Sequence, residues 1–211
     1  MEKIRNKLYG KHDPYSKLKK LPLDLQGWAS SDSPVFEKLI DEVKPDLIIE
    51  VGTWKGRSAI QMAKYCLKHK KDFEIVCVDT WLGSVEHWAG VDPNLRNKNF
   101  KNGRPNIYEQ FLSNVVRSGM EKYITPFPID SINGALSLHL LKAQADIIYI
   151  DAGHEYLSVK CDLYEYSKLV RPGGCILGDD FFYGPVASAA YDTFGDDKVI
   201  KLSEDKFLWI K

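Results

Sequence analysis

Three aspartates follow short apolar runs of the sequence. Asp151 ends the run DIIYI, and Asp179 and Asp180 follow the run CILG. Neighbouring parallel strands lie about 4.8 Å apart and end at the same edge of a sheet, so these carboxylates would repel one another unless a cation lay between them. Carboxylate oxygens suit Mg²⁺, Mn²⁺ or Ca²⁺ better than zinc. An Asp-Asp pair alone would more simply cap the next segment, but the third carboxylate favours a divalent metal, Mg²⁺ first and Mn²⁺ second.

One histidine lies close to these acids in the sequence. His154 comes three residues after Asp151, and an imidazole takes up a proton near neutral pH, as a general base must. We therefore predict His154 as the general base and Asp151 as a second catalytic residue. A histidine near a helix start is often only structural, and His87, from the loop that follows residue 80, is an alternative base.

A glycine turn follows the apolar run LIIEV and leads into a helical segment. Such a turn presents free backbone N–H groups at a positive helix end and suits an anionic ligand. Trp54 stands where a dinucleotide fingerprint needs a second glycine, which argues against NAD. S-adenosylmethionine has no pyrophosphate, and Glu50 and Ser58 would suit its ammonium and carboxylate groups; a plain tight turn is the alternative. The predicted contacts of this turn are Glu50, Gly52, Thr53, Trp54, Gly56 and Ser58.

A carboxylate also ends the next apolar run. Asp79, in IVCVDTW, is placed to accept hydrogen bonds from two vicinal ribose hydroxyls, which favours an adenosine ligand. Asp130 or Ser131, at the end of a third run, would meet the adenine ring, although a helix N-cap explains Ser131 equally well. The further predicted donor contacts are Asp79, Thr80, Trp81, Asp130, Ser131 and Asp151.

The elements that must position these residues alternate along the chain. Short apolar runs and helical periodicity alternate from about residue 34, as in an α/β protein with a parallel sheet, and the tail KVIKLSEDKFLWIK predicts a closing hairpin. The predicted strands are Asp46–Val51, Phe73–Asp79, Tyr123–Ile129, Asp146–Asp151 and Cys175–Gly178. The predicted helices are Pro34–Val43, Gly56–His69, Ile107–Ser118, Ile132–Lys142, Tyr156–Val170 and Val186–Phe194, and Arg171–Gly174 ends the fifth.

Two segments flank or interrupt this pattern. Residues 1–33 are expected to form a mobile or lid-like lead-in to a domain that spans residues 34–211. The stretch 81–106 is rich in Gly, Asn, Pro and Trp and too long for a plain connection, so we expect it to cover a substrate. Its candidate substrate contacts are His87, Trp88 and Arg104.

Composition excludes several classes of function. The 29 basic and 29 acidic residues balance, so the chain has no excess positive charge for a nucleic acid. No apolar run approaches the roughly 20 residues of a membrane helix, and the start of the sequence lacks the apolar centre of a signal peptide. The four scattered cysteines are expected to be reduced. We expect a cytoplasmic protein that acts on a small molecule or glycan and that could form a homo-oligomer.

Several segments together resemble one family. The segments EVGTWKGRSA, VDTWLGS, YIDAGHEY and RPGGCILGDDF, followed by VASAAYDTF, are similar to the metal-dependent O-methyltransferases grouped with macrocin O-methyltransferase, over most of residues 45–195. The resemblance implies a Rossmann-like, doubly wound, seven-stranded class I methyltransferase sheet whose last strand is antiparallel. It also implies S-adenosylmethionine as methyl donor and a magnesium-type ion on the matching acids Asp151, Asp179 and Asp180.

Many members of that family methylate sugar hydroxyls. We therefore expect methyl transfer to a hydroxyl of a sugar or glycosylated acceptor, with a catechol or other aromatic diol as the alternative acceptor. A non-catalytic adenosyl-binding domain is the alternative from another class. The spacing of Tyr164 and Lys168 matches the catalytic pair of short-chain dehydrogenases, but such pairs are common on exposed helix faces, and we interpret it as coincidence.

Overall fold

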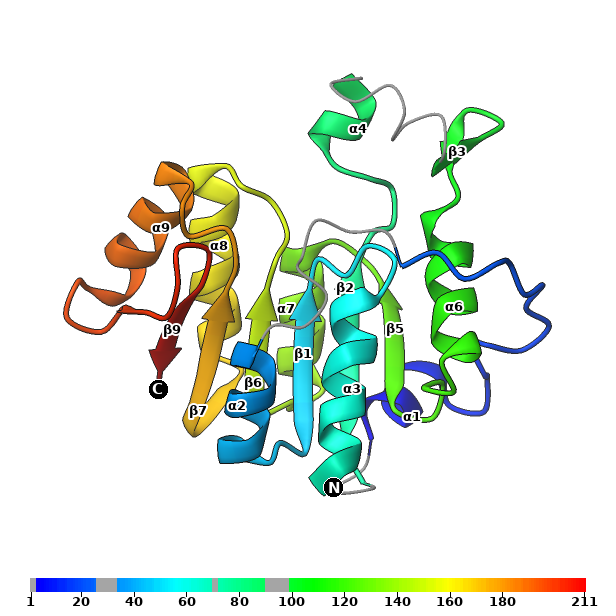
Figure 1. Ribbon diagram of the computed structural model, residues 1–211, viewed down its shortest axis with the longest axis horizontal. Coiled ribbons are helices and arrows are strands. Elements are labelled where there is room, and N and C mark those ends of the chain that lie inside the picture. The colour runs from blue at the N-terminus through cyan, green and yellow to red at the C-terminus, as the bar shows by residue number, and fades with distance from the viewer. Residues whose placement is uncertain (1–2, 26–33, 70–71, 90–98) are drawn as a thin grey trace.

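A single mixed sheet organises the chain. The computed structural model describes residues 3–25, 34–69, 72–89 and 99–211. Its seven-stranded sheet has the order β5-β2-β1-β6-β7-β9-β8 (Figure 1). The strands are β1 (Leu47–Val51), β2 (Glu74–Asp79), β5 (Ile124–Pro128), β6 (Ala145–Ile150), β7 (Val170–Gly178), β8 (Ile200–Lys201) and β9 (Phe207–Ile210).

Neighbours among the first five strands of this order, β5, β2, β1, β6 and β7, pair in parallel. Strand β9 runs antiparallel to both β7 and β8. The predicted seven-stranded sheet with an antiparallel last strand is therefore confirmed, as is the closing hairpin. The central strands are mostly apolar and almost entirely buried, which is typical of parallel sheets that helices cover on both faces.

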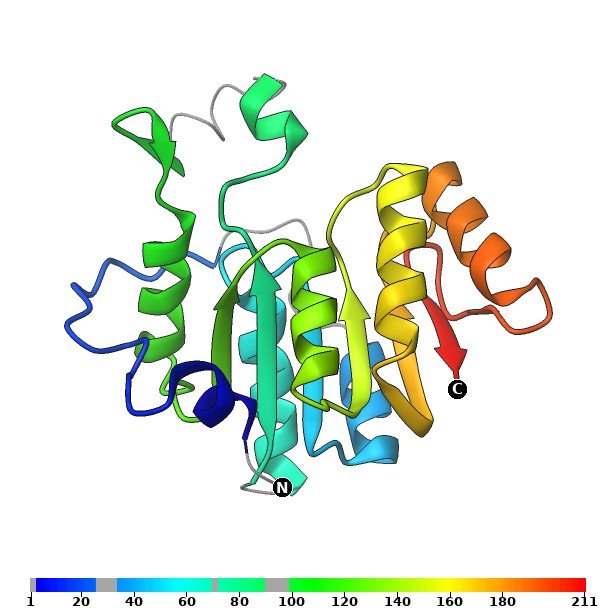
Figure 2. The ribbon, with the colours of Figure 1, turned by 180° about the vertical axis from the view of Figure 1, so that it is seen from behind.

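Helices cover the sheet in two layers. Figure 1 shows α2 (Pro34–Val43), α3 (Arg57–His69) and α6 (Ile107–Arg117) on one face. Figure 2 shows α1 (Ile4–Tyr9), α7 (Ser131–Leu140) and α8 (Tyr156–Ser167) on the other, with α9 (Gly184–Phe194) beside α8. Successive strand residues alternate between the two cores, so Ile48 packs toward the first layer and Ile49 toward the second.

The end of α8 and the start of β7 differ from the prediction. The helix stops at Ser167, and Val170 already pairs with Ala145 of β6, so Arg171–Gly174 belong to the strand rather than to a helix stop. Gly174 fits because an added Cβ would lie 2.8 Å from the carbonyl oxygen of Asp146. The C-terminus also pairs here, since Lys211 N donates to Gly174 O over 3.0 Å. Proline and glycine therefore mark a close strand approach at this position.

The first part of the lead-in, residues 3–15, is anchored at the end of the sheet away from the predicted site. Glu74, at the start of β2, accepts hydrogen bonds from the backbone N–H groups of Ile4 (2.7 Å) and Arg5 (2.8 Å). Tyr15 donates to the carbonyl oxygen of Ile124 over 2.7 Å. The expected lid is therefore not formed by residues 3–15. Residues 26–33 lie outside the described residues, so a covering role for that part stays a prediction.

The structure also bears on membrane-spanning helices and on the state of the cysteines. Among the described residues, no helix combines the length and apolarity needed to cross a bilayer. The four cysteines are free thiols: Cys66, Cys77 and Cys175 are buried, and Cys161 is exposed.

The Glu74 anchor leads to a test of the lead-in. Glu74 is 5% exposed and also accepts from Thr125 Oγ1 over 2.7 Å, so Glu74→Ala leaves three donors without their partner. We expect the free energy of unfolding to fall by about 2–4 kcal/mol, measured by urea denaturation. The control is Glu42→Ala, on the exposed face of α2, which should change it by less than about 0.5 kcal/mol. Equal effects of the two variants would contradict the anchor.

Candidate functional site

The glycine turn and the acidic strand ends meet at the carboxyl edge of the sheet. Backbone hydrogen bonds connect the strand ends there, from Gly52 N to Val78 O (3.0 Å) and from Asp151 N to Val51 O (2.8 Å). Asp179 N likewise donates to Ile150 O over 3.0 Å. The turn after β1 and the acids after β6 and β7 therefore form one continuous surface.

Gly52 allows the closest contact at this edge. Its φ is +82°, and an added Cβ would lie 1.9 Å from the carbonyl oxygen of Asp151. Any other residue would push the turn away from the end of β6. Gly52 thus sets the distance between the predicted donor turn and the predicted metal site.

Gly56 lies against the core on the side where a side chain would project, and its predicted contact with a donor stays a prediction. Its φ is also +82°, but an added Cβ would meet the ring of Phe111 at 2.8 Å. This glycine therefore permits close packing between the start of α3 and α6. A larger residue here would disturb the core as well as the turn.

Glu50 lies beneath the turn rather than at its surface. It is fully buried and accepts hydrogen bonds from Thr53 Oγ1 (3.2 Å) and Ser58 Oγ. Burial raises its pKa from 4.5 to about 8, the Asp151 charge adds to the rise, and the hydroxyl hydrogen bonds oppose it. Glu50 and Ser58 therefore bind each other in this structure, and their separate contacts with a methyl donor stay predictions.

Asp79 holds the glycine turn in place. Its Oδ2 accepts from Thr53 N (2.9 Å) and Trp54 N (2.8 Å), and its Oδ1 accepts from Trp81 N (2.7 Å). A carboxylate offers about four acceptor positions, so these bonds leave little capacity for two ribose hydroxyls. Burial raises the pKa of Asp79 although the three N–H groups favour its charged form. Thr80 caps the next turn, accepting from Leu82 N over 3.1 Å.

Trp81 is a core residue. Only 2% of it is exposed, its ring packs against Tyr108 and Phe111, and its Nε1 donates to Trp54 O over 2.8 Å. The rings of α6 therefore cover the side chain of Trp81, and its predicted contact with a donor stays a prediction. Trp81 supports the turn from below.

The segment above this edge includes a short helix, α4 (Val85–Ala89), and a small hairpin of β3 (Phe100–Lys101) and β4 (Arg104–Pro105) (Figure 1). His87 stacks on Trp54 with ring centroids 4.4 Å apart. Trp88 is 53% exposed, and Arg104 is exposed on β4. Residues 90–98, inside the predicted substrate-covering stretch, lie outside the described residues, and substrate contacts by His87, Trp88 and Arg104 stay predictions.

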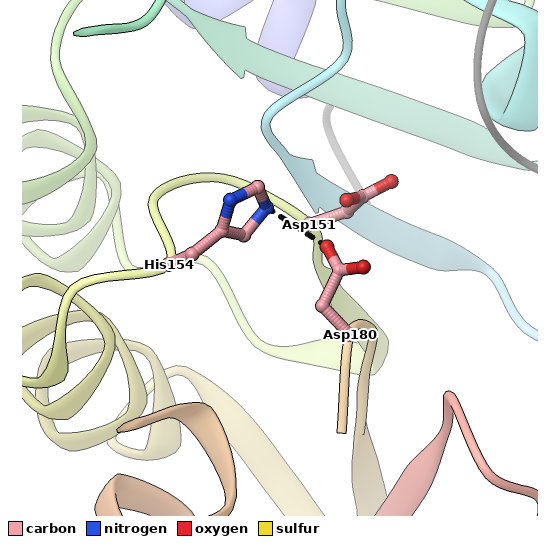
Figure 3. Close-up of side chains that lie close together, drawn as sticks. All are labelled: Asp151, His154 and Asp180. Atoms are coloured by element: carbon pink, nitrogen blue, oxygen red, sulfur yellow. Dashed lines mark ion pairs between the residues drawn. The ribbon is translucent and has the colours of Figure 1, made fainter. Parts of the chain in front are cut away.

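Asp151, His154 and Asp180 come together beyond β6 and β7 (Figure 3). One ligand atom from each lies within 4.8 Å of the others. His154 Nε2 is 2.8 Å from Asp180 Oδ2. Asp180 adopts a left-handed φ of +54°, which takes its side chain out of the strand alternation and toward His154.

Asp179 points to different partners. Lys206 Nζ lies 2.6 Å from its Oδ1, and the hydroxyl of Tyr149 donates to its Oδ2. The same hydroxyl lies 3.1 Å from Asp151 Oδ2, so its single proton is shared between the two carboxylates. The structure therefore separates Asp179 from Asp180, and Asp179 is not among the three grouped ligands. Lys206 and Tyr149 were missed by the sequence analysis, because a lysine in a hairpin turn and a tyrosine inside a strand have no local signal of a site.

The chemistry of this cluster fits a divalent cation. Burial, and then the charges of Asp179 and Asp180, raise the pKa of Asp151, so its anionic form lacks a full counter-charge. Two carboxylates beside an imidazole are a set that Mg²⁺ accepts through oxygen and that Mn²⁺ accepts through oxygen and nitrogen. A small pocket next to the cluster is lined by Asp151, Gly153, His154 and Asp180.

The end of β5 carries the residues predicted to meet adenine. Asp130 is the N-cap of α7 and accepts from Asn133 N over 3.0 Å, and hydrogen bonds from Asn133 lower its pKa. Asp130, rather than Ser131, therefore caps this helix. The carbonyl oxygen of Ser131 accepts from the hydroxyl of Tyr166 over 2.8 Å. Contact of either residue with a base stays a prediction.

The dehydrogenase-like spacing of Tyr164 and Lys168 is explained by their exposed position at the end of α8. Tyr164 is 59% exposed on α8, Lys168 Nζ lies 4.0 Å from the centroid of its ring, and Lys168 also pairs with Glu165 at 2.7 Å. These contacts are typical of a solvated helix face, which supports the interpretation of coincidence.

The buried acid Glu50 predicts how stability changes with pH. Because its pKa rises from 4.5 to about 8 on folding, the folded protein keeps a proton that the unfolded chain releases, and stability falls as pH rises toward 8. We expect the free energy of unfolding, measured by urea denaturation in EDTA, to be lower at pH 8 than at pH 6. Glu50→Gln should make this decline shallower, and an unchanged slope would contradict the assignment. Glu42→Gln is the exposed control.

Comparisons with known proteins place this fold in a family. The methyltransferase domain family matches residues 49–181. A protein of Acanthamoeba polyphaga mimivirus is 29% identical over 150 residues, which cover 70% of this chain but only 58% of that relative. The chain thus spans less than two thirds of the relative's length.

Solved structures share the fold. An O-methyltransferase from Bacillus cereus in complex with SAH has a TM-score of 0.62 at 16% identity, covering 90% of this chain and 84% of that one. The calicheamicin methyltransferase CalS11 has a TM-score of 0.62 at 17% identity, covering 84% and 77%. The narrower resemblance to macrocin O-methyltransferase stays a prediction. Because the family match covers more than half of the chain, this protein belongs to the methyltransferase domain family.

Proposed function

We propose that this protein transfers a methyl group from S-adenosylmethionine to a hydroxyl of a sugar or glycosylated acceptor, assisted by a divalent metal. The observation that carries the proposal is the junction at Gly52, where the glycine turn touches the backbone of Asp151. A methyl donor on the turn and an acceptor beside the acidic cluster would then be neighbours. Proximity and alignment of this kind supply much of the rate of a transfer reaction.

The donor side rests on the fold and on the turn. The Bacillus cereus relative was solved with SAH, the demethylated form of the donor. In the present chain, Asp79 fixes the backbone of Thr53 and Trp54, so the turn is ordered before any ligand arrives. Preorganisation of this kind reduces the entropy lost on binding.

The acceptor side rests on the acidic cluster. Asp151 and Asp180 are the carboxylates that would hold the ion, which would lower the pKa of the acceptor hydroxyl when bound. Asp180 orients the imidazole of His154 through the 2.8 Å contact with Nε2. As the acceptor oxygen bonds to the methyl carbon, the carbon–sulfur bond breaks, its electron pair stays on sulfur, and the hydroxyl proton passes to His154.

A sugar acceptor is favoured over a catechol by one comparison. CalS11 is described as a TDP-rhamnose 3'-O-methyltransferase, and it shares the fold with this chain. The exposed ring of Trp88 above the edge suits the apolar face of a sugar, and it would also suit an aromatic ring. The acceptor therefore has to be chosen by assay.

The decisive experiment follows methyl transfer from labelled S-adenosylmethionine onto a panel of glycosides, nucleotide sugars and catechols. EDTA should abolish transfer, and Mg²⁺ or Mn²⁺ should restore it, while calorimetry should show that donor binding survives EDTA. Full activity in EDTA would remove the metal role. Donor binding without transfer to any acceptor would favour a non-catalytic adenosyl-binding domain, and tight NAD binding with no response to adenosyl ligands would overturn the donor assignment.

The base assignment gives a second test. His154→Ala should lower kcat by about 10² to 10⁴-fold, the range for loss of a general base, and leave donor affinity unchanged. The residual rate should rise with pH as the acceptor ionises without help. His139→Ala, on the exposed end of α7, is the matched control. An unchanged rate in His154→Ala would move the base to His87 or to an aspartate.

A further inference from the structure

Lys206 brings a positive charge beneath the acidic edge from the β8–β9 hairpin. The residue is 5% exposed, and its Nζ lies 2.6 Å from Asp179 Oδ1. The ammonium group also lies 5.8 Å from the ring centroid of Phe36 and 5.5 Å from that of Tyr149. A lysine is rarely buried unless its charge is paired, so the contact with Asp179 is a fixed part of this site.

The hairpin holds this lysine at a defined position. The carbonyl oxygen of Lys206 accepts from Leu202 N (2.9 Å) and Ser203 N (3.2 Å), and the backbone N–H of Lys206 donates to Ser203 Oγ over 3.1 Å. Phe181 N donates to Asp205 O over 3.0 Å. The turn that carries Lys206 is therefore connected to the segment that carries the two aspartates.

The two oxygens of Asp179 are both engaged. Oδ1 accepts from Lys206 and from the backbone N–H of Asp180 (3.0 Å), and Oδ2 accepts from Tyr149. The neighbouring Asp180 instead turns toward His154. Adjacent acids of the same type thus have different partners, one a buried internal cation and the other an open cluster.

We propose that Lys206 is a positioning residue that acts as a built-in counter-cation, keeping Asp179 out of the metal's coordination shell. The divalent ion is then held by the carboxylates of Asp151 and Asp180. This inference rests on the metal-assisted function proposed above and goes beyond it, because it assigns one of the three aspartates to a lysine. The lysine also reduces the repulsion among the acids before a metal binds.

Charge balance makes the proposal testable without an activity assay. Lys206→Met removes one positive charge and frees Asp179, so the site should bind Mn²⁺ at least about tenfold more tightly, because one charge a few ångström from a divalent ion has an effect of about that size even at the dielectric constant of water. The same variant should melt at a lower temperature in EDTA and recover in Mn²⁺. The double variant Lys206→Met with Asp179→Asn replaces one neutral pair by another, and its affinity for Mn²⁺ should stay within about threefold of wild type.

The measurement is calorimetric titration of the full chain with Mn²⁺, with circular dichroism to confirm folding. Asp180→Asn is the matched control, and its affinity should fall by at least the roughly 10- to 100-fold that loss of an outer-shell partner costs, because a ligand itself is replaced. If the double variant loses as much affinity as Asp180→Asn, Asp179 is a ligand and the proposal is overturned. It is also overturned if folded Lys206→Met binds Mn²⁺ no more tightly than wild type.

A failure of the proposed function has a different signature. If the wild-type chain binds no Mn²⁺, the metal step itself is wrong and the inference falls with it. If the wild type binds Mn²⁺ and only the variants deviate from expectation, the metal-assisted function stands and the role of Lys206 alone is rejected. Should Lys206→Met fail to fold, the double variant still decides the question, because it carries no unpaired buried charge.

Discussion

The close approach of Gly52 to the end of β6 is the constraint on which the rest of the site depends. No side chain fits at Gly52, since even a Cβ would lie 1.9 Å from the carbonyl oxygen of Asp151. The parallel pairing of β1 with β6 fixes the register of the two strands, and the glycine lets the turn after one lie directly on the loop after the other. A ligand-binding turn and an acidic strand end therefore share one edge, as the topology of open α/β sheets favours.

That approach has an electrostatic consequence, because it places acids where water is largely excluded. Burial raises the pKa of both Glu50 and Asp151, and the charge of Asp151 adds to the rise at Glu50. Two sets of contacts stabilise the buried carboxylates: the hydroxyls of Thr53 and Ser58 donate hydrogen bonds to Glu50, and Lys206 pairs with Asp179. The remaining negative charge lies toward Asp180, where a divalent ion would complete the balance.

The sequence alone predicts what depends on local pattern. The apolar runs predict the strands of the sheet, and the acids at the strand ends predict that Asp151 and Asp180 lie close together. The partners that modify these residues come from far along the chain, such as Lys206 for Asp179 and Phe111 for Gly56, and no local spacing indicates them. The burial of Trp81 likewise depends on rings of α6, which no local pattern around Trp81 indicates.

The glycine turn also anchors segments on two sides, which explains its two unusual residues. Trp54 occupies a left-handed φ of +51°, a strained position for a bulky residue, and its ring stacks on His87 from α4. Lys55 is 1% exposed and pairs at 2.6 Å with Asp24 of the lead-in, where Asn114 binds the carbonyl oxygens of both. A dinucleotide turn would need glycine where Trp54 stands. Here the turn instead connects the lead-in and α4 to the sheet, so the conformation of the turn depends on its contacts with both segments.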